Sequence, residues 1–423
     1  MARRSRFVPD ISELRARFLS PRAEAAALAV AAGSDELELW KHFSLVEGGP
    51  LYRLGHALGL TGGASGLVRI GLALSFFTWL PLAALTLIPH DMPIGPSLPF
   101  ILSFGTHARL LVAIPLLFVA EAVFDARIRQ VLDHIVDSRL VPDRQRSALN
   151  GILQDAARLR DVWHVEALVL ALTLGLMVWG FRQDLPLAIP SWRTSLGGHR
   201  TVAGWWYGFV AIPIFQFLFW RWCARLLLWS YVLWRIGHLD LHLIPTHPDL
   251  AAGLGGFGVA HVALAPLGFS ATAILAGTVA EQILYAGARV QDYTLPLVGI
   301  VAGTSFVLIA PLLRFTWQLV EVRQRGLIDY GALASSYVRA FDAKWLRQYP
   351  PPAEPLLGSA DIQSLADLSN SFEVITRMRY VPLSMTQFLI LLAVTAAPAA
   401  PLVLFVIPFN DLILRGLHTL LMV

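Results

Sequence analysis

The stretch LAAGLGGFGVAHVALAPLGFSATAILAGTVA, residues 250–280, contains no Asp, Glu, Lys or Arg. A helix that crosses a bilayer core needs about 20 consecutive, mainly apolar residues, and this stretch is longer than that. Four further runs share the property, so the sequence predicts a protein that crosses a membrane several times. These runs cover residues 70–89, 201–220, 293–313 and 380–410.

The overall composition agrees with a membrane location. Only 15% of the 423 residues are charged, whereas soluble domains carry about 25%. The single cysteine, Cys223, excludes an intrachain disulfide framework. No basic module with interleaved aromatic residues is present, so we expect no nucleic-acid partner and name the lipid bilayer as the first partner.

We expect an all-α polytopic membrane protein with about seven transmembrane helices, in a range of six to eight. Pro398 and Pro401 predict a kink or break in the last of them, because proline removes a backbone donor and clashes with the preceding turn. If the last segment is instead a re-entrant hairpin, the tail returns to the side from which it came. The expected spans are 70–89, 106–124, 163–181, 201–220, 257–281, 294–314 and 382–407.

The basic residues predict an orientation. With the amino terminus in the cytoplasm, 27 of the 33 Lys and Arg residues lie in inner segments and six lie outside or near the outer boundary. This is a strong positive-inside bias. The basic start, Arg3-Arg4, is followed by Asp10 and Glu13 rather than by an apolar stretch, so it does not read as a secretory signal.

The segments between the spans show helical periodicity, so we expect the membrane helices to extend into a helical cytoplasmic layer. Residues 124–140 continue the second span, 314–349 continue the sixth, and 359–379 form a further helix with Ser359 as its cap. The expected regions are a cytoplasmic segment at 1–66, the first six spans within 67–320 with cytoplasmic extensions at 122–162 and 221–249, a cytoplasmic segment at 321–381, and the last span with an amphipathic tail at 382–423.

The densest polar cluster is GHLDLHLIPTHPDLAAGLGGFG, residues 237–258. His238 and His242 are four residues apart, a spacing that places two metal ligands on one helical face, and His247 and Asp249 are candidates to complete a weak metal site. The alternative is an interfacial connector in which the Thr-His-Pro-Asp turn caps the fifth span. We favour the connector, because a single His pair is a common pattern.

The glycines of this segment, from Gly253 to Gly258, match the dinucleotide-binding fingerprint only in form. That motif requires a preceding strand within a βαβ unit, and the surrounding pattern is helical. The glycines therefore predict a flexible start for the fifth span, or small surfaces for close helix packing.

Charged residues at membrane depth are the second group of candidates. Arg221 and Arg225 share one helical face. If their helix continues past Trp220, both lie deep and mark an anionic path or partner. If the span ends at Trp220, both lie at the inner interface, which the aromatic belt favours. The polar or pathway residues that we single out are Arg109, Glu121, Glu166, Arg221, Arg225, Glu281 and Arg314.

Uncharged polar residues and prolines also interrupt the spans. His261, Gln216 and Gln387 are expected to make interhelical hydrogen bonds. Besides the last span, proline occurs within five of the other six expected spans, and such breaks free backbone carbonyls that transporters and channels use to line cavities. These prolines are Pro81, Pro115, Pro213, Pro266 and Pro311.

Two segments, LIPTHPDLAAGLGGFG (243–258) and EPLLGSADIQSLADLSNSFEVITRMR (354–379), resemble polytopic bacterial membrane proteins with no assigned activity. The resemblance covers the chain from the fourth span to near the carboxyl end. It implies a bacterial inner-membrane setting and carries no functional residue with it.

Three functions remain in view. The leading hypothesis is a channel or transporter for an ion or small solute, in a chain that can form a homo-oligomer. The second is a membrane enzyme that uses a metal ion held by the 238–249 cluster; we name no other cofactor and no catalytic residue. The third is a membrane scaffold or sensor that acts through its cytoplasmic helices. No Ser-His-Asp, Walker or EF-hand pattern appears, so an enzyme is less favoured than a transport protein.

Overall fold

The computed structural model describes residues 39–48, 63–87, 99–182, 192–194, 199–347, 355–356 and 358–405. Within these ranges the regular elements are helices, and the only β-type pairing is one isolated bridge between Thr194 and Arg200. The prediction of an all-α protein is confirmed. Most of the segment 1–66 and the tail after Phe405 lie outside the described residues.

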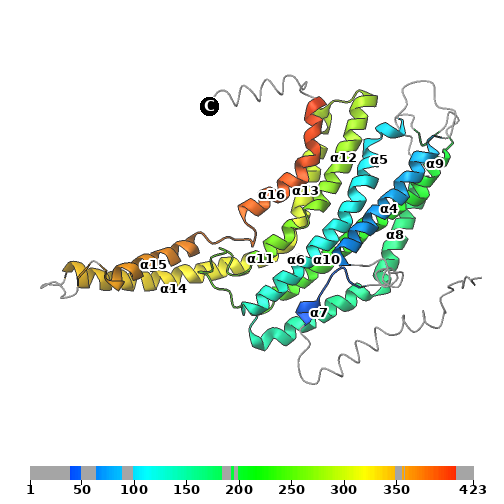
Figure 1. Ribbon diagram of the computed structural model, residues 1–423. Coiled ribbons are helices and arrows are strands. Elements are labelled where there is room, and N and C mark those ends of the chain that lie inside the picture. Colours follow the sequence, from blue (N-terminus) through cyan, green and yellow to red (C-terminus); the bar gives the residue numbers. More distant parts are fainter. Residues whose placement is uncertain are drawn as a thin grey trace, which may run out of the picture.

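A bundle of long helices forms the body of the molecule (Figure 1). Several of them are composite, because a short π or 3₁₀ segment is inserted without ending the helix. The bundle consists of α4 (Gly63–Leu85), α5 (Phe104–His107) with η2 (Ala108–Ala113) and α6 (Ile114–Asp137), α8 (Trp163–Arg182), α9 (Val202–Trp206) with η4 (Tyr207–Ala211) and α10 (Ile212–Ile236), α11 (Gly255–Val262), α12 (Ala265–Ala286), α13 (Thr294–Ile309) and α16 (Met385–Ala396) with η8 (Ala397–Phe405).

Six helical stretches of the described chain are long and apolar enough to cross a membrane. The protein is therefore a polytopic helical membrane protein that contacts the lipid bilayer. The expected second span, 106–124, is not among the six. It is a continuous helix (α5, η2, α6) that packs against α4, α11 and α12. Its charged residues Arg109 and Glu121 form hydrogen bonds with side chains of other helices. The six stretches are 65–85, 163–180, 202–236, 255–286, 290–347 and 385–404.

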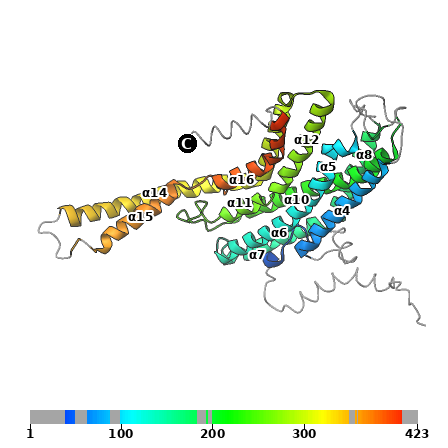
Figure 2. The ribbon, with the colours of Figure 1, turned by 45° about the horizontal axis from the view of Figure 1, so that its top comes forward.

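The bundle has two distinct ends. At one end, which we call the arm end, lie α7 (Arg146–Asp161), the connector 237–254 and the start of a helical arm. At the opposite end, which we call the far end, lie η1 (Phe100–Leu102), α5, α9 and the carboxyl end of α12 (Figures 1 and 2). Gly287 ends α12 there in the left-handed conformation, with φ 65°, which glycine adopts without steric cost.

The arm is a helical hairpin that projects from the bundle (Figures 1 and 2). α13 passes through the 3₁₀ segment η6 (Ala310–Phe315) into α14 (Thr316–Asp342), and α15 (Ala360–Thr376) returns along it. This confirms that the sixth span continues as a helix. Ser359 is the N-cap residue of α15, but its side chain makes no capping hydrogen bond.

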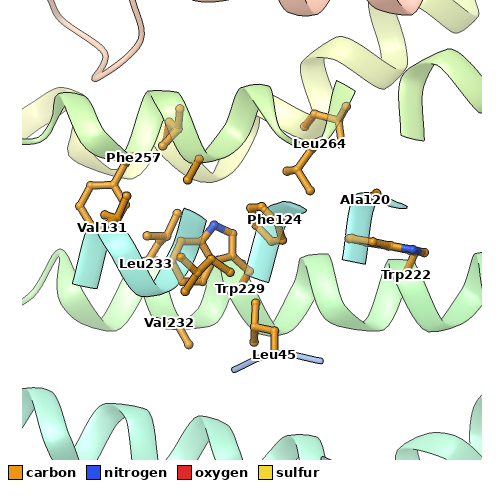
Figure 3. Close-up of a cluster of buried hydrophobic side chains, with 14 of the residues drawn as sticks. Leu45, Ala120, Phe124, Val131, Trp222, Trp229, Val232, Leu233, Phe257 and Leu264 are labelled. Atoms are coloured by element: carbon orange, nitrogen blue, oxygen red, sulfur yellow. The ribbon is translucent and has the colours of Figure 1, made fainter. Parts of the chain in front are cut away.

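The packed core lies where α6, α10 and α11 meet (Figure 3). Phe124 and Trp229 touch edge to face, with ring centroids 5.9 Å apart. Phe257 of α11 lies at the same level, and Leu45 of the amino-terminal segment lies beside Trp229. Among lipid-embedded helices such contacts stabilise the fold through dispersion and interhelical hydrogen bonds, because burial there removes little water.

α16 packs along α11 and α12 through small residues. A Cβ atom on Gly258 would lie 2.3 Å from the Pro382 carbonyl oxygen, so only glycine permits this approach. Ser384 and Gln387 form a capping box at the start of α16. At the other end of the contact, Leu402 of η8 is buried against α12. The predicted break at Pro398 and Pro401 is confirmed: α16 becomes a 3₁₀ helix from Ala397 onward.

Candidate functional site

The deepest charged contact joins α6 and α10. The Arg225 guanidinium donates a hydrogen bond to the Glu121 carboxylate. Their side chains are 8% and 2% exposed. The Trp222 ring lies beside Arg225, and its indole N–H donates to the Leu117 carbonyl at 3.1 Å. α10 continues without interruption to Ile236, so the helix does not end at Trp220 and Arg225 faces a carboxylate rather than lipid headgroups.

Arg221 and Glu166 extend this site, which we call the Arg225 cluster. Arg221 lies one turn before Arg225 and is within electrostatic range of both Glu121 and Glu166. Glu166 stands in the first turn of α8, which packs against α10. The structure therefore brings four of the sequence-predicted pathway residues into one region, with two positive and two negative side chains.

The amino-terminal segment docks beside the Arg225 cluster. The Ser44 hydroxyl donates to the Asp125 carboxylate at 2.7 Å, and the Leu45 amide donates to the same oxygen at 2.9 Å. Arg129 pairs with the other Asp125 oxygen at 2.6 Å. Trp40 is buried in the same contact. Sequence patterns did not single out Ser44 or Asp125, because nothing local links residues 81 positions apart.

His261 connects three helices near the Arg225 cluster. Its Nε2 accepts a hydrogen bond from the Trp229 indole at 3.0 Å, and its Nδ1 lies 2.6 Å from the Leu308 carbonyl oxygen. The first contact requires a bare Nε2 and the second requires a proton on Nδ1, so both are satisfied by one neutral tautomer. The prediction that His261 makes interhelical hydrogen bonds is confirmed, and its contacts are structural.

A second polar cluster, the Glu281 cluster, lies at the far end. The Glu281 carboxylate accepts hydrogen bonds from the Gly105 amide at 2.6 Å and the Ser103 hydroxyl at 3.3 Å. Arg109 donates to the Tyr207 hydroxyl. Arg109 belongs to the π-helical segment η2 and Tyr207 to the π-helical segment η4. π-Segments inside α-helices occur frequently at functional sites, which makes this cluster a candidate site.

Arg193 completes the Glu281 cluster from the segment before α9. Its guanidinium donates to the Thr106 hydroxyl at 3.0 Å and lies 4.3 Å from the centre of the Tyr207 ring. Both arginines and Glu281 are within electrostatic range of Tyr207. Arg109 and Glu281 were predicted from the sequence, whereas Arg193 and Tyr207 were missed because each looks like an ordinary boundary residue.

The connector 237–254 is organised by one carboxylate. Asp249 accepts hydrogen bonds from the amides of Ala251, Gly253 and Gly255, at 2.8 to 3.1 Å, and pairs with His247 at 2.8 Å. Burial raises the pKa of Asp249, but the amide hydrogen bonds and His247 outweigh it, so the pKa lies below its usual value. Because Gly255 is the first residue of α11, Asp249 caps that helix, as the connector hypothesis expected.

The other two candidate metal ligands, His238 and His242, have separate surroundings. His238 lies 2.7 Å from the Trp234 carbonyl oxygen, and His242 is exposed and bonded through its backbone amide. Asp240, which lies between them in the sequence, pairs with Arg144. Across the described ranges no group of three or more His, Cys, Asp or Glu residues is arranged to hold a metal ion. The 238–249 side chains therefore do not form one ligand set.

Arg314, the last predicted pathway residue, has a local role. Its guanidinium donates to the Gly237 carbonyl oxygen at 2.9 Å, and Gln318 donates to the same oxygen at 2.9 Å. Gly237 follows the last residue of α10, so both side chains satisfy a carbonyl at a helix end. Arg314 is thus separate from the two clusters.

No family model, curated protein or solved structure matches the chain. Function must therefore be argued from the contacts described above.

Proposed function

We propose that the protein is a channel or transporter for an ion or small solute. The observation that carries the proposal is that three neighbouring helices of the bundle are interrupted along their course. α11 ends at Val262 before α12 begins, α13 passes into a 3₁₀ segment at Ala310, and α16 does so at Ala397. Interrupted membrane helices leave backbone groups available inside the protein, and transporters build substrate and ion sites from such groups.

The distribution of charge supports the same proposal. The Arg225 cluster and the Glu281 cluster lie on shared helices, and α6 and α10 with their π-helical extensions contribute to both. Ionisable residues inside a membrane bundle are costly, so they mark functional sites more often than chance. Together the clusters place polar groups at two levels of the bundle, on helices that pack against the interrupted helices α11 and α12.

We further propose that the arm end faces the cytoplasm of a bacterial cell. The support is the positive-inside count in the sequence together with the resemblance of two segments to bacterial membrane proteins. The arm, α7 and the connector would then be cytoplasmic.

A scaffold or sensor role is the second candidate, and the arm is the observation that favours it. Large apolar side chains on α14 and on the π-helical segment η7 (Ala343–Arg347) are exposed: Trp317 at 75%, Ile328 at 70% and Leu346 at 74%. Their spacing of 11 and 18 residues places them on one stripe of a helix. Such a stripe supports contact with another copy or a partner.

Flux through reconstituted protein tests the proposed transport function. Purified protein in liposomes should dissipate an imposed Na⁺, K⁺, Cl⁻ or proton gradient faster than protein-free liposomes. The double variant Pro398→Ala/Pro401→Ala, which allows α16 to continue as an α-helix, should reduce the flux at least tenfold. Gly299→Ala, at a site with nothing within 4 Å, is the control and should retain it. Flux equal to that of empty liposomes under every gradient would contradict the proposal.

A further inference from the structure

Three buried hydroxyl groups on three neighbouring helices have no hydrogen-bond partner in the described part of the chain. They belong to Thr272 of α12, Ser305 of α13 and Thr395 of α16, and their residues are 0%, 3% and 0% exposed. Hydroxyls on membrane helices normally bond the carbonyl one turn earlier. Leaving them unsatisfied costs about 1–3 kcal/mol each.

Neighbouring residues on the same helices behave normally. Ser270 and Thr278 of α12 donate to the carbonyls four residues earlier, at 2.7 and 2.9 Å, and Thr304 of α13 does so at 2.5 Å. The three buried hydroxyls therefore lack the bond that their neighbours make to their own helices, and the Thr395 hydroxyl lies against Gly268 of α12.

Helix register places the three hydroxyls near one level. A Cβ atom on Gly268 would lie 2.3 Å from the Thr395 hydroxyl oxygen, and Thr272 follows Gly268 by one turn on the same face. α13 is anchored to α11 by the contact between His261 and Leu308. Ser305 lies one turn before Leu308 on the same buried face of α13, so it stands at a similar height in the bundle. α12, α13 and α16 all pack against one another.

The break in α16 adds a backbone oxygen near the same level. Pro398 has no N–H group, so the Val394 carbonyl loses its usual helical donor. The Ala397 carbonyl belongs to the 3₁₀ segment η8, whose hydrogen bonds run to the residue three positions on. Leu402, packed on α12 at Ala276, keeps this part of η8 against the bundle. The region therefore combines side-chain hydroxyls with a backbone carbonyl, which are both neutral oxygen ligands.

We propose that Thr272, Ser305 and Thr395, with the Val394 carbonyl oxygen beside the Pro398 break, form a binding site for a monovalent metal cation such as Na⁺. Neutral oxygens can replace the hydration shell of a monovalent cation. Sites for Ca²⁺ and Mg²⁺ use carboxylates, and neither α13 nor α16 contains an acidic residue. The site rests on the proposed transport function and names the class of ion that the protein would carry. Measuring Na⁺ binding apart from flux allows the site and the transport function to fail separately.

Thermal unfolding of the detergent-purified full chain tests the site, with NaCl compared to N-methylglucamine chloride at equal ionic strength. Na⁺ should raise the Tm in a saturable manner by a few degrees, as expected for a ligand that binds only the folded state. Thr272→Val and Thr395→Val preserve side-chain shape. They should raise the Tm without Na⁺, because a buried unsatisfied hydroxyl is removed, and should abolish the response to Na⁺.

Thr278→Val and Thr304→Val are the matched controls, since those hydroxyls bond their own helices, and both should keep the full response. Binding of radioactive Na⁺ to the same samples gives a second readout that does not depend on stability. The inference is overturned if wild-type protein shows neither a Tm response nor Na⁺ binding, or if both valine variants respond like wild type. Na⁺ binding without flux would leave the site standing and remove the transport proposal. Flux without Na⁺ binding would remove the proposed Na⁺ site and leave the transport proposal standing.

Discussion

Arg225 and Glu121 form an ion pair between the two central helices, 104 residues apart in the chain and nearly closed to solvent. Removing one partner of such a pair leaves an uncompensated buried charge, whereas replacing both with apolar residues of similar volume is often tolerated. We expect Glu121→Leu to lower stability by about 3–5 kcal/mol.

The double variant Glu121→Leu/Arg225→Met should recover most of that loss. Chemical denaturation in detergent of Glu121→Leu, Arg225→Met and the double variant, analysed as a double-mutant cycle, measures the coupling free energy between the two residues. Additive losses from the two single substitutions would show that the pair is not coupled as described.

Close helix contact at Gly258 is a second target. Gly258→Ala should lower the Tm by several degrees, because the added Cβ would meet the Pro382 carbonyl and force α16 away from α11. Gly299→Ala and Gly303→Ala, which meet nothing within 4 Å, should be neutral or stabilising, since alanine is the better helix former by about 1 kcal/mol. A Tm for Gly258→Ala equal to those of the controls would contradict the packing.

The Asp249 cap predicts a pH dependence of stability. Its pKa is lowered in the folded state, so the stabilisation is fully present above the unfolded pKa and is lost as the pH falls through the folded pKa, from about pH 5 downward. Asp249→Asn should lower stability at pH 7 and flatten the Tm profile below pH 5. Asp240→Asn, in the same connector but exposed, is the control and should leave that profile steep.

Docking of the amino-terminal segment depends on Asp125. Asp125→Asn removes the charge that holds the Ser44 hydroxyl, the Leu45 amide and Arg129. We expect faster amide hydrogen exchange over residues 40–47, by at least tenfold, with little change in α12. Asp143→Asn is the comparison, because its carboxylate pairs with Arg146 at an exposed position. Unchanged exchange at Leu45 would show that the other contacts, apolar burial and the hydrogen bond from Arg160 to the Ser44 carbonyl, hold the segment.

Metal analysis of the purified protein tests the finding that the 238–249 side chains do not form one ligand set. We expect purified protein to contain less than one-tenth equivalent of bound transition metal, with no change in metal content in His242→Ala. A stoichiometric metal that disappears in His242→Ala would return the enzyme hypothesis to consideration.

Much of the fold could be read from local sequence. Uncharged runs identified the apolar helices, the helical period carried α6 and α14 beyond their spans, and Pro398 predicted the change in α16. These features depend on neighbouring residues and on backbone chemistry, which a single sequence contains.

The partners of charged residues could not be read in the same way. The aromatic belt at Trp220 favours an interfacial position for Arg225 over a deep one, yet a carboxylate on another helix pairs with it. Tyr207 and Arg109, from two π-segments 98 residues apart, form a hydrogen bond across helices. Such contacts depend on tertiary packing, which no local pattern records.

The η6 segment joins α13 to α14, so the sixth span and the arm form one continuous helical piece. Gln318 bonds the Gly237 carbonyl, and a Cβ atom on Gly326 would lie 2.8 Å from Pro245, so the connector holds the first part of α14. From Gly326 to Asp342 the helix continues for about 24 Å at 1.5 Å per residue. A bend of about 10° beyond Gly326 would therefore carry the Asp342 end through roughly 4 Å, while the bundle and the connector stay in place.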